Sequence, residues 1–251
     1  MELQEFFSQH PRVALAFSGG VDSAYLLYAA VQCGAQVRPY YVKTAFQPQF
    51  EYEDALRLAD QLGVPMKTIH LNPLDDPQVA ANPGNRCYYC KRHIFTAITQ
   101  TAREEGFHLL LDGTNASDEC GDRPGMKVLE EQHILSPLRI CGLTKSDVRR
   151  LSKEAGLFTW DKPAYACLAT RIPAGEKITA EKLKAIDESE AVLFAMGFSD
   201  FRVRLRDGGA LLQFTEEQQR RAQEMLGEIT TELLKHFETI KIDLKAREKS
   251  K

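Results

Sequence analysis

A serine- and glycine-rich hexapeptide comes between an apolar run and a helical pattern near the amino terminus. Its members are Ser18, Gly19, Gly20, Val21, Asp22 and Ser23. Two glycines let the backbone approach an anion closely and adopt positive φ. The free N–H groups and the positive end of the following helix favour phosphate oxygens. The two serines add hydroxyl donors, and Asp22 could help to hold Mg²⁺. The hexapeptide therefore predicts a phosphate-binding loop, although its spacing fits neither G-x-x-x-x-G-K-[ST] nor G-x-G-x-x-G.

A second polar segment, Asp112–Asp118, follows the apolar run Leu109–Leu111. Open α/β sheets bind ligands at the carboxyl ends of their strands, so this segment is a candidate for the same site. A polar Asx-type turn is the alternative interpretation.

The chain has six cysteines, and two of them form the pair Cys87-Tyr88-Tyr89-Cys90. The pair is expected at a loop-to-helix entry with Arg86 and Lys91 on either side of it, and both the helix start and the basic neighbours favour reactive thiolates. A redox pair or two packed thiols are the alternatives, and the lack of a second C-x-x-C pair argues against a four-cysteine zinc site. Cys167 is a lone thiol close to Arg171 in a segment without helical or strand periodicity, which predicts a chemically active residue.

The remaining cysteines carry no ligand-like spacing: they are Cys33, Cys120 and Cys141. Cys33 precedes a helix-ending glycine and is expected in the core. The acidic start of the sequence lacks the pattern of a signal peptide, so we expect a cytoplasmic protein with reduced thiols rather than disulfides.

The elements that must position these residues alternate between short apolar runs and amphipathic patterns. Expected strands cover residues 13–17, 37–42, 66–71 and 109–111, and expected helices cover 22–34, 52–62, 94–105 and 145–155. The helix at 52–62 is expected to bury Leu56, Ala59 and Leu62, and Thr144 to Asp147 resembles a capping box. This alternation predicts an α/β fold, a parallel twisted sheet with helices on both faces.

The pattern changes after a long loop at residues 160–179. A helix at 180–196, strands at 201–205 and 210–214, a helix at 215–237 capped by Thr215, and a strand at 240–244 predict a small α+β unit. The expected domains are therefore residues 1–178 and 179–251. On the first strand of the small unit, Arg202, Arg204 and Arg206 alternate and share one face, which suits a phosphate.

Composition limits the partners. The 251 residues include 32 Lys and Arg against 35 Asp and Glu, a net charge of −3, which argues against a nucleic-acid partner. No apolar run approaches the roughly 18 residues that a membrane helix needs. Glu190 and the six histidines have no spacing that assigns them a ligand role.

The hexapeptide matches the SGGxDS loop of the PP-loop ATP pyrophosphatases. This resemblance implies a site for ATP and Mg²⁺, in which Asp112, Gly113 and Asn115 lie near the nucleotide. It also implies that an oxygen of the substrate is adenylated with release of pyrophosphate, and that a nucleophile then displaces AMP.

From about Val13 to Phe214, the order of the motifs resembles the LarE-type sulfur transferases of nickel-pincer nucleotide cofactor synthesis. The motifs are Asn85–Lys91, Asp112–Asp118, Ser136–Arg139 and Cys167–Pro173. The resemblance implies adenylation of a carboxylate of pyridinium-3,5-biscarboxylic acid mononucleotide and replacement of AMP by sulfur. It assigns catalytic roles to Cys167, Arg171 and Asp22, the substrate phosphate to Arg202 and Arg204, and a homo-oligomeric state.

Two sulfur sources remain open. Cys87, Cys90 and Cys167 could hold a [4Fe–4S] cluster whose fourth iron delivers sulfide, and the presence of three candidate thiols favours this arrangement. Alternatively, Cys167 gives up its own sulfur and becomes dehydroalanine. Other functions to be weighed are a PP-loop tRNA thiolase, an amide-forming PP-loop synthase and a nucleotide-binding module without catalysis.

Overall fold

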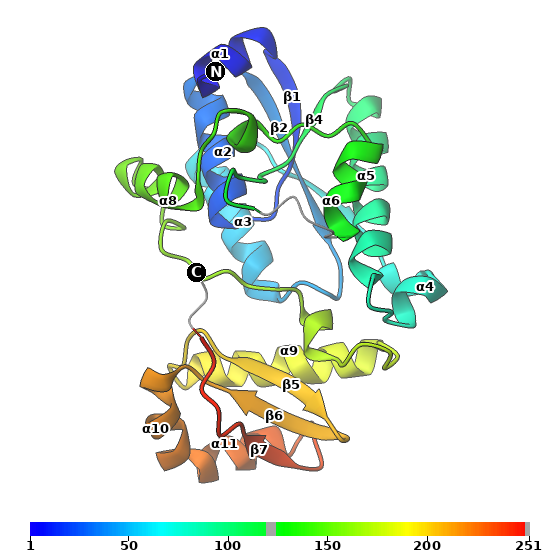
Figure 1. Cartoon of the computed structure of the whole chain (residues 1–251), viewed down its shortest axis with the longest axis vertical. Coiled ribbons are helices and arrows are strands. Elements are labelled where there is room, and N and C mark those ends of the chain that lie inside the picture. The colour runs from blue at the N-terminus through cyan, green and yellow to red at the C-terminus, as the bar shows by residue number, and fades with distance from the viewer. Residues whose placement is uncertain (119–123, 249–251) are drawn as a thin grey trace. The chain divides into compact units, whose positions relative to one another are not determined.

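The computed structural model describes residues 1–118 and 124–248. Its contacts divide the chain into two compact units (Figure 1). The first comprises Met1–Pro73 and Asn85–Lys162, and the second comprises Leu74–Gly84 and Pro163–Lys251. The functional division expected after residue 178 remains a prediction. No helix in the described residues is long and apolar enough to cross a membrane.

The first unit contains a four-stranded parallel sheet in the order β3-β2-β1-β4. Its strands are β1 (Arg12–Ala16), β2 (Gln36–Lys43), β3 (Lys67–His70) and β4 (Leu110–Leu111). Val13 is paired with Val37 on one side, and Ala14 with Leu110 on the other. The parallel sheet confirms the predicted α/β fold class.

Helices cover both faces of this sheet (Figure 1). They are α1 (Leu3–Gln9), α2 (Val21–Gln32), α3 (Gln49–Gln61), α5 (Arg86–Glu104), α6 (Pro124–Glu131), α7 (Pro137–Ile140) and α8 (Lys145–Glu154). Because neighbouring strand residues point to opposite faces, β1 supplies two hydrophobic cores. Val13 and Leu15 pack in one core with residues of α2 and α8, and Ala14 packs in the other with residues of α5 and α6.

Two details of the expected helices were wrong. In α3 the buried side chains are Ala55, Leu58 and Ala59, whereas Leu56 is 41% exposed. An i, i+3, i+4 stripe keeps to one face of a helix, and Leu56 lies about 100° around the helix from Ala55, outside that stripe. Helix α5 begins at Arg86, eight residues before the helix expected at 94–105, so the C-x-x-C pair, expected at a helix entry, lies within the helix itself.

The capping box of α8 is confirmed, because the side chains of Thr144 and Asp147 each accept from the other's backbone N–H. The short helices α1, α4 (Pro77–Ala80), α6 and α7 were not anticipated. Each is eight residues or fewer, too short for a clear periodic pattern.

The second unit packs helices against a three-stranded sheet in the order β5-β6-β7. Its elements include the 3₁₀ turn η2 (Leu168–Arg171), α9 (Ala180–Ala195), β5 (Arg202–Arg206), β6 (Gly209–Gln213), α10 (Glu216–Glu224), α11 (Leu226–Leu233) and β7 (Ile240–Ile242). The 3₁₀ turn η1 (Pro73–Asp75) and α4 precede α5. Asp207 and Gly208 have φ of 51° and 77°, as a two-residue hairpin of type I′ requires.

The single helix expected at 215–237 was wrong. The helix is interrupted at Met225, which is both the C-cap of α10 and the N-cap of α11. Gly227, a weak helix former, follows the break. Thr215 occupies the N-cap position of α10 without a side-chain capping hydrogen bond.

Candidate functional site

The order of the strands creates a switch point between β1 and β4. From β1 the sheet extends to β2 and β3 on one side and to β4 on the other. At such a point the loops that follow the two neighbouring strands run in opposite directions. A crevice therefore opens between them at the carboxyl ends of the strands. The loop Ser18–Ser23 follows β1 and the loop Asp112–Asp118 follows β4. The two segments singled out in the sequence therefore meet at one place.

Hydrogen bonds within the first loop hold it in shape. Ser18 Oγ and Ser23 Oγ lie 3.1 Å apart, and Gly20 N donates to Ser18 Oγ at 3.3 Å. Ser23 Oγ also donates to the carbonyl of Gly20 at 3.2 Å. Gly20 is the N-cap of α2, and a glycine has no side chain that could cap the first N–H groups of the helix. The first N–H groups of α2 are thus directed towards the loop, as an anion site requires.

Two glycines are required by the backbone geometry of this site. Gly19 has φ of +73°, and a Cβ there would lie 3.0 Å from Ala55 Cβ. A Cβ on Gly113 would lie 2.9 Å from Ser23 N, which is backbone and cannot move aside. The second loop therefore rests directly on the first turn of α2.

Side chains join the two loops as well. Asn115, only 2% exposed, donates through Nδ2 to Asp22 Oδ1 at 3.2 Å. Asp112 is also buried and accepts from the hydroxyls of Thr114 and Ser136. Its carboxylate thus joins its own loop to Ser136, the N-cap residue of α7. The structure brings together the predicted residues of both segments.

Sequence reasoning missed Lys145. Its Nζ lies 2.5 Å from Asp22 Oδ2, so a lysine from the start of α8 reaches the loop that itself contains no basic residue. The capping box located the start of α8, and this was the signal that could have drawn attention to Lys145.

The C-x-x-C pair occupies one turn of α5 in the first unit. Cys87 is exposed and Cys90 is buried. Arg86 is buried next to them, with its guanidinium 5.6 Å from the centre of the Phe46 ring. Within residues 1–118 and 124–248 the cysteines form no disulfide. No group of three or more His, Cys, Asp or Glu in these residues is arranged to hold a metal.

Cys167 belongs to the second unit and is the N-cap of η2. Its carbonyl accepts from Thr170 N at 2.9 Å and from Thr170 Oγ1 at 2.8 Å. The expected periodicity-free loop thus contains an ordered turn at the thiol. The three thiols of the predicted cluster come from two units, and their assembly remains a prediction.

Arg171 is the last residue of this turn, and its side chain pairs with that of Glu190 in α9; each of the two side chains is 1% exposed. Arg171 Nη1 donates to the carbonyl of Ala166 at 3.0 Å. Glu190 Oε1 accepts from Val203 N at 3.0 Å, which ties the pair to β5. Burial raises the pKa of Glu190, and nearby donors and arginines oppose that rise. Glu190, to which the sequence assigned no role, is thus the anchor of Arg171.

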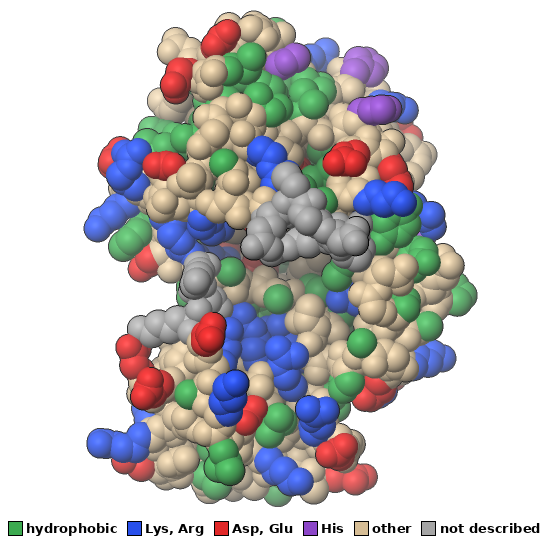
Figure 2. All heavy atoms as spheres, viewed as in Figure 1, with side chains coloured by type: hydrophobic (Ala, Val, Ile, Leu, Met, Phe, Trp, Pro, Cys, Tyr) green, Lys and Arg blue, Asp and Glu red, His purple; other side chains and the backbone are tan. Residues whose placement is uncertain are grey.

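The two arginines expected to bind a phosphate contact the Cys167 segment. Arg202 is buried and donates through Nη2 to the carbonyl of Ala164 at 3.0 Å. Arg204 is exposed and donates through Nη1 to the carbonyl of Thr170 at 3.0 Å. Figure 2 shows Lys and Arg side chains gathered over this part of the unit. The guanidinium groups of Arg171 and Arg202 also lie 4.7 and 5.1 Å from the centre of the Tyr165 ring.

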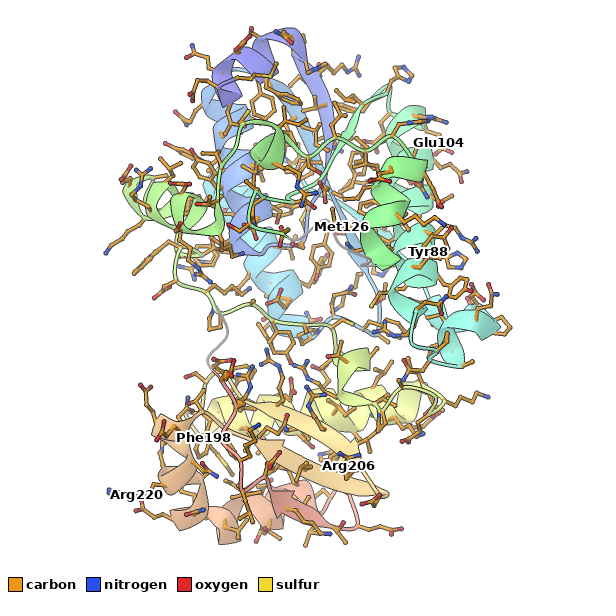
Figure 3. The ribbon with its side chains drawn as sticks, viewed as in Figure 1. Tyr88, Glu104, Met126, Phe198, Arg206 and Arg220 are labelled. Carbon is orange, nitrogen blue, oxygen red and sulfur yellow. The ribbon has the colours of Figure 1, made fainter. Side chains whose placement is uncertain are left out.

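The three alternating arginines of β5 differ in their exposure to solvent. Arg202 is covered, whereas Arg204 and Arg206 are exposed, and Arg206 is the last residue of β5 (Figure 3). The sequence placed all three on one face, and the coverage of Arg202 comes from the segment that carries Cys167.

Cys33 and Cys141 differ from Cys87, Cys90 and Cys167 because no site role was expected for them. Cys33 and Cys141 are partly buried, and burial raises the pKa of both thiols. Cys120 lies outside the described residues.

No family model matches the chain. An uncharacterized protein of Synechocystis sp. is 35% identical over 218 residues, 86% of this chain and 81% of that protein. The pyridinium-3,5-bisthiocarboxylic acid mononucleotide synthase of Lactiplantibacillus plantarum is 30% identical over 207 residues, 82% of this chain and 75% of the synthase. A tRNA-specific 2-thiouridylase of Thermotoga sp. is 26% identical over 256 residues, 82% of this chain and 71% of the thiouridylase.

The 30% identity to the synthase over most of both chains establishes the relationship. It agrees with the motif order and with the parallel sheet that carries the SGGVDS loop. The relationship to tRNA thiouridylases is weaker and reflects the shared PP-loop fold. The chain belongs to the LarE-type family of ATP-dependent sulfur transferases, within the PP-loop ATP pyrophosphatases.

Proposed function

We propose that this enzyme adenylates a carboxylate of pyridinium-3,5-biscarboxylic acid mononucleotide and replaces AMP with sulfur to give the thiocarboxylate. The carboxylate oxygen attacks the α-phosphorus of ATP, and pyrophosphate leaves with the electron pair of the broken P–O bond. A sulfur nucleophile then attacks the carbonyl carbon, and AMP leaves with the electron pair of the broken C–O bond. Adenylation turns a poor leaving group into a good one.

The observation that carries the adenylation step is the hydrogen bond between Asn115 and Asp22. It joins the loops after β1 and β4 at the switch point, where a nucleotide is expected. Loop N–H groups and the two serines would cradle the pyrophosphate end of ATP. The oxygens of Asp22 suit Mg²⁺, which would offset the charge that develops on departing pyrophosphate.

In the second unit, Arg204 and Arg202 would hold the phosphate of the mononucleotide, since planar guanidinium groups match phosphate oxygens. Arg171 would act next to the reacting carboxylate or AMP, held in place by Glu190. The Ala166 carbonyl that Arg171 binds immediately precedes Cys167. The arginines are therefore coupled to the position of the thiol.

The sulfur source follows one of two routes that share Cys167. In the first, Cys87, Cys90 and Cys167 hold a [4Fe–4S] cluster that supplies an additional sulfide. In the second, the Cys167 thiolate forms a thioester with the substrate. Removal of the Cys167 α-proton and cleavage of its C–S bond then release the thiocarboxylate and leave dehydroalanine. Three thiols of suitable chemistry support the first route.

The test is anaerobic turnover with ATP, Mg²⁺ and the pyridinium mononucleotide, with AMP, pyrophosphate and thiocarboxylate measured. AMP formation that depends on the mononucleotide supports the proposal. AMP formation that depends on tRNA instead would overturn it. Cys167→Ala should retain mononucleotide-dependent exchange of pyrophosphate into ATP and lose the thiocarboxylate, whereas Cys33→Ala should retain both.

Iron and sulfide analysis and intact mass then separate the two routes. Iron that is lost in Cys87→Ala and in Cys90→Ala supports the cluster. A mass loss equal to H₂S at Cys167 after turnover supports sacrifice of that residue.

A homo-oligomer built through the second unit is also proposed. Large apolar side chains are exposed on this unit: Phe194, Leu226, Leu234 and Leu244. Exposed apolar side chains mark a candidate association surface where they form a contiguous patch. Light scattering of the wild type and of Leu234→Glu would test this, and a wild-type monomer would contradict it.

A further inference from the structure

Lys162 is the last residue of the first unit, and its ammonium group is paired with two carboxylates of α3. Lys162 Nζ lies 3.0 Å from Glu51 Oε1 and 2.7 Å from Asp54 Oδ2. The side chains of Lys162 and Glu51 are only 14% and 12% exposed. Burial raises the pKa of Glu51, and the ammonium group of Lys162 opposes that rise. The buried carboxylate of Glu51 therefore depends on Lys162 for its charge compensation.

The backbone that leads to Lys162 is also held by the first unit. Arg149 of α8 donates through Nη1 to the carbonyl of Trp160 at 2.8 Å. Through Nη2 it donates to the carbonyl of Lys162 at 3.1 Å. The next two residues, Pro163 and Ala164, are exposed and belong to the second unit. Side-chain and backbone contacts of Lys162 thus fix the point at which the chain leaves the first unit.

The helix that binds Lys162 also supports the phosphate loop. Gly19 of that loop packs so closely on α3 that a Cβ at Gly19 would lie 3.0 Å from Ala55 Cβ. Asp54 immediately precedes Ala55 in α3, and Glu51 lies about one helical turn before it. One rigid element therefore holds both the phosphate loop and the point at which the chain leaves the first unit.

The length of the chain then limits the position of the thiol. Cys167 follows Lys162 by five residues, and five extended residues span at most about 18 Å. Both routes of the proposed function need Cys167 close to the adenylated carboxylate. A short connection to a fixed point raises the effective concentration of a reacting group, because the group samples less space.

We propose that Lys162 is a positioning residue for sulfur transfer, whose ion pairs with Glu51 and Asp54 fix the start of the segment 163–167 at α3. This inference rests on the proposed function, in which Cys167 takes part in sulfur transfer. The role involves no contact between Lys162 and the reacting atoms. It concerns the second step, in which sulfur replaces AMP, and leaves adenylation unaffected.

A merely structural role for Lys162 predicts a different pattern. Lys162→Met would leave the carboxylate of Glu51 buried without its partner, so stability, adenylation and sulfur transfer would fall together. The double variant Lys162→Met/Glu51→Gln removes both charges and should recover stability. In a merely structural role, sulfur transfer would then recover as well. In a positioning role, sulfur transfer stays impaired in the double variant, because the attachment to α3 is still missing.

The experiment compares the full-length wild type with Lys162→Met, Lys162→Arg and the double variant. Mononucleotide-dependent exchange of pyrophosphate into ATP measures adenylation, and single-turnover formation of the thiocarboxylate measures sulfur transfer. Sulfur transfer should be roughly 10- to 100-fold slower in Lys162→Met and in the double variant, as expected for a misplaced reacting group, while pyrophosphate exchange stays near the wild-type rate. Lys162→Arg keeps the charge and should recover part of the loss.

The matched control is Lys184→Met, which removes a lysine that is 73% exposed and paired with Glu188 on α9. Both rates should remain at the wild-type values in this variant. Hydrogen–deuterium exchange of residues 160–167 tests the attachment without any substrate. It should be faster in Lys162→Met and in the double variant than in the wild type and the control.

Wild-type sulfur transfer in Lys162→Met would overturn the inference, and so would unchanged deuterium exchange. Full recovery of sulfur transfer in the double variant would also overturn it, because stability alone would then explain the defect. If Lys162→Met does not fold, the double variant provides the same comparison. A wild type without mononucleotide-dependent pyrophosphate exchange would refute the proposed function, whereas faster deuterium exchange in the variants would still demonstrate the attachment.

Discussion

Arg171 and Glu190 form a buried ion pair with two contacts in the second unit. Arg171 Nε lies 2.9 Å from Glu190 Oε1, and Arg171 Nη2 lies 3.2 Å from Glu190 Oε2. Each side chain is 1% exposed. A charge buried this deeply is costly unless its partner stays in place. The pair also connects α9 to the turn that carries Cys167.

Glu190→Ala is expected to destabilise the second unit by about 3–5 kcal/mol, because it leaves the guanidinium of Arg171 buried without its carboxylate. Urea unfolding, monitored by far-UV circular dichroism, measures this loss of unfolding free energy. Glu188→Ala is the control, since Glu188 is itself 45% exposed and its contacts with Lys184 and His236 should contribute less than about 1 kcal/mol. Equal stabilities of the two variants would contradict the role assigned to the pair.

Arg204→Gln is expected to raise KM for the pyridinium mononucleotide roughly 10- to 100-fold, the effect of losing one charged hydrogen bond to phosphate. KM for ATP should change little. Arg206→Gln removes the same charge from the same strand and should leave both constants near the wild-type values. Steady-state kinetics of AMP release gives the comparison, and an equal effect of both substitutions would indicate general attraction rather than a defined phosphate contact.

Gly113→Ala is expected to weaken ATP binding, because its Cβ would lie 2.9 Å from Ser23 N and displace the first turn of α2. Gly227→Ala is the control. A Cβ there has no neighbour within 4 Å, and alanine favours the helix by roughly 0.5–1 kcal/mol. Calorimetric titration with ATP compares the two variants. Wild-type ATP affinity in Gly113→Ala would contradict the requirement for close contact between the two loops.

The cysteines should differ in alkylation rate. Cys87 is exposed, whereas Cys33 and Cys141 are partly buried and burial raises the pKa of their thiols. A raised thiol pKa means less thiolate at pH 8, so Cys33 and Cys141 should react more slowly than Cys87 and should accelerate as the pH rises further. Peptide mass spectrometry after brief iodoacetamide treatment at pH 8 and at pH 9.5 measures both trends. Faster labelling of Cys33 than of Cys87 would contradict them.

The local pattern was sufficient for the strands and the first loop. Buried parallel strands read as continuous apolar runs, and the glycine- and serine-rich hexapeptide needs no distant partner to be recognised. The start of α5 was missed because Arg86–Lys91 mixes polar and aromatic residues, and its helical conformation is not evident from periodicity. The burial of Ala55 and Leu58 instead of Leu56 was decided by contact with the sheet.

By itself, the sequence determined the α/β class and the family and predicted the phosphate loop, since these depend on residue types at fixed short spacings. The tertiary structure decided which distant residues meet. Lys145 reaches Asp22 across 123 positions of the chain, and Arg171 is anchored by Glu190, to which no motif assigned a role. Such contacts arise from the packing of α8 beside α2 and of α9 beside β5 and η2. No periodicity along the chain encodes them, because their partners are selected by the folded geometry.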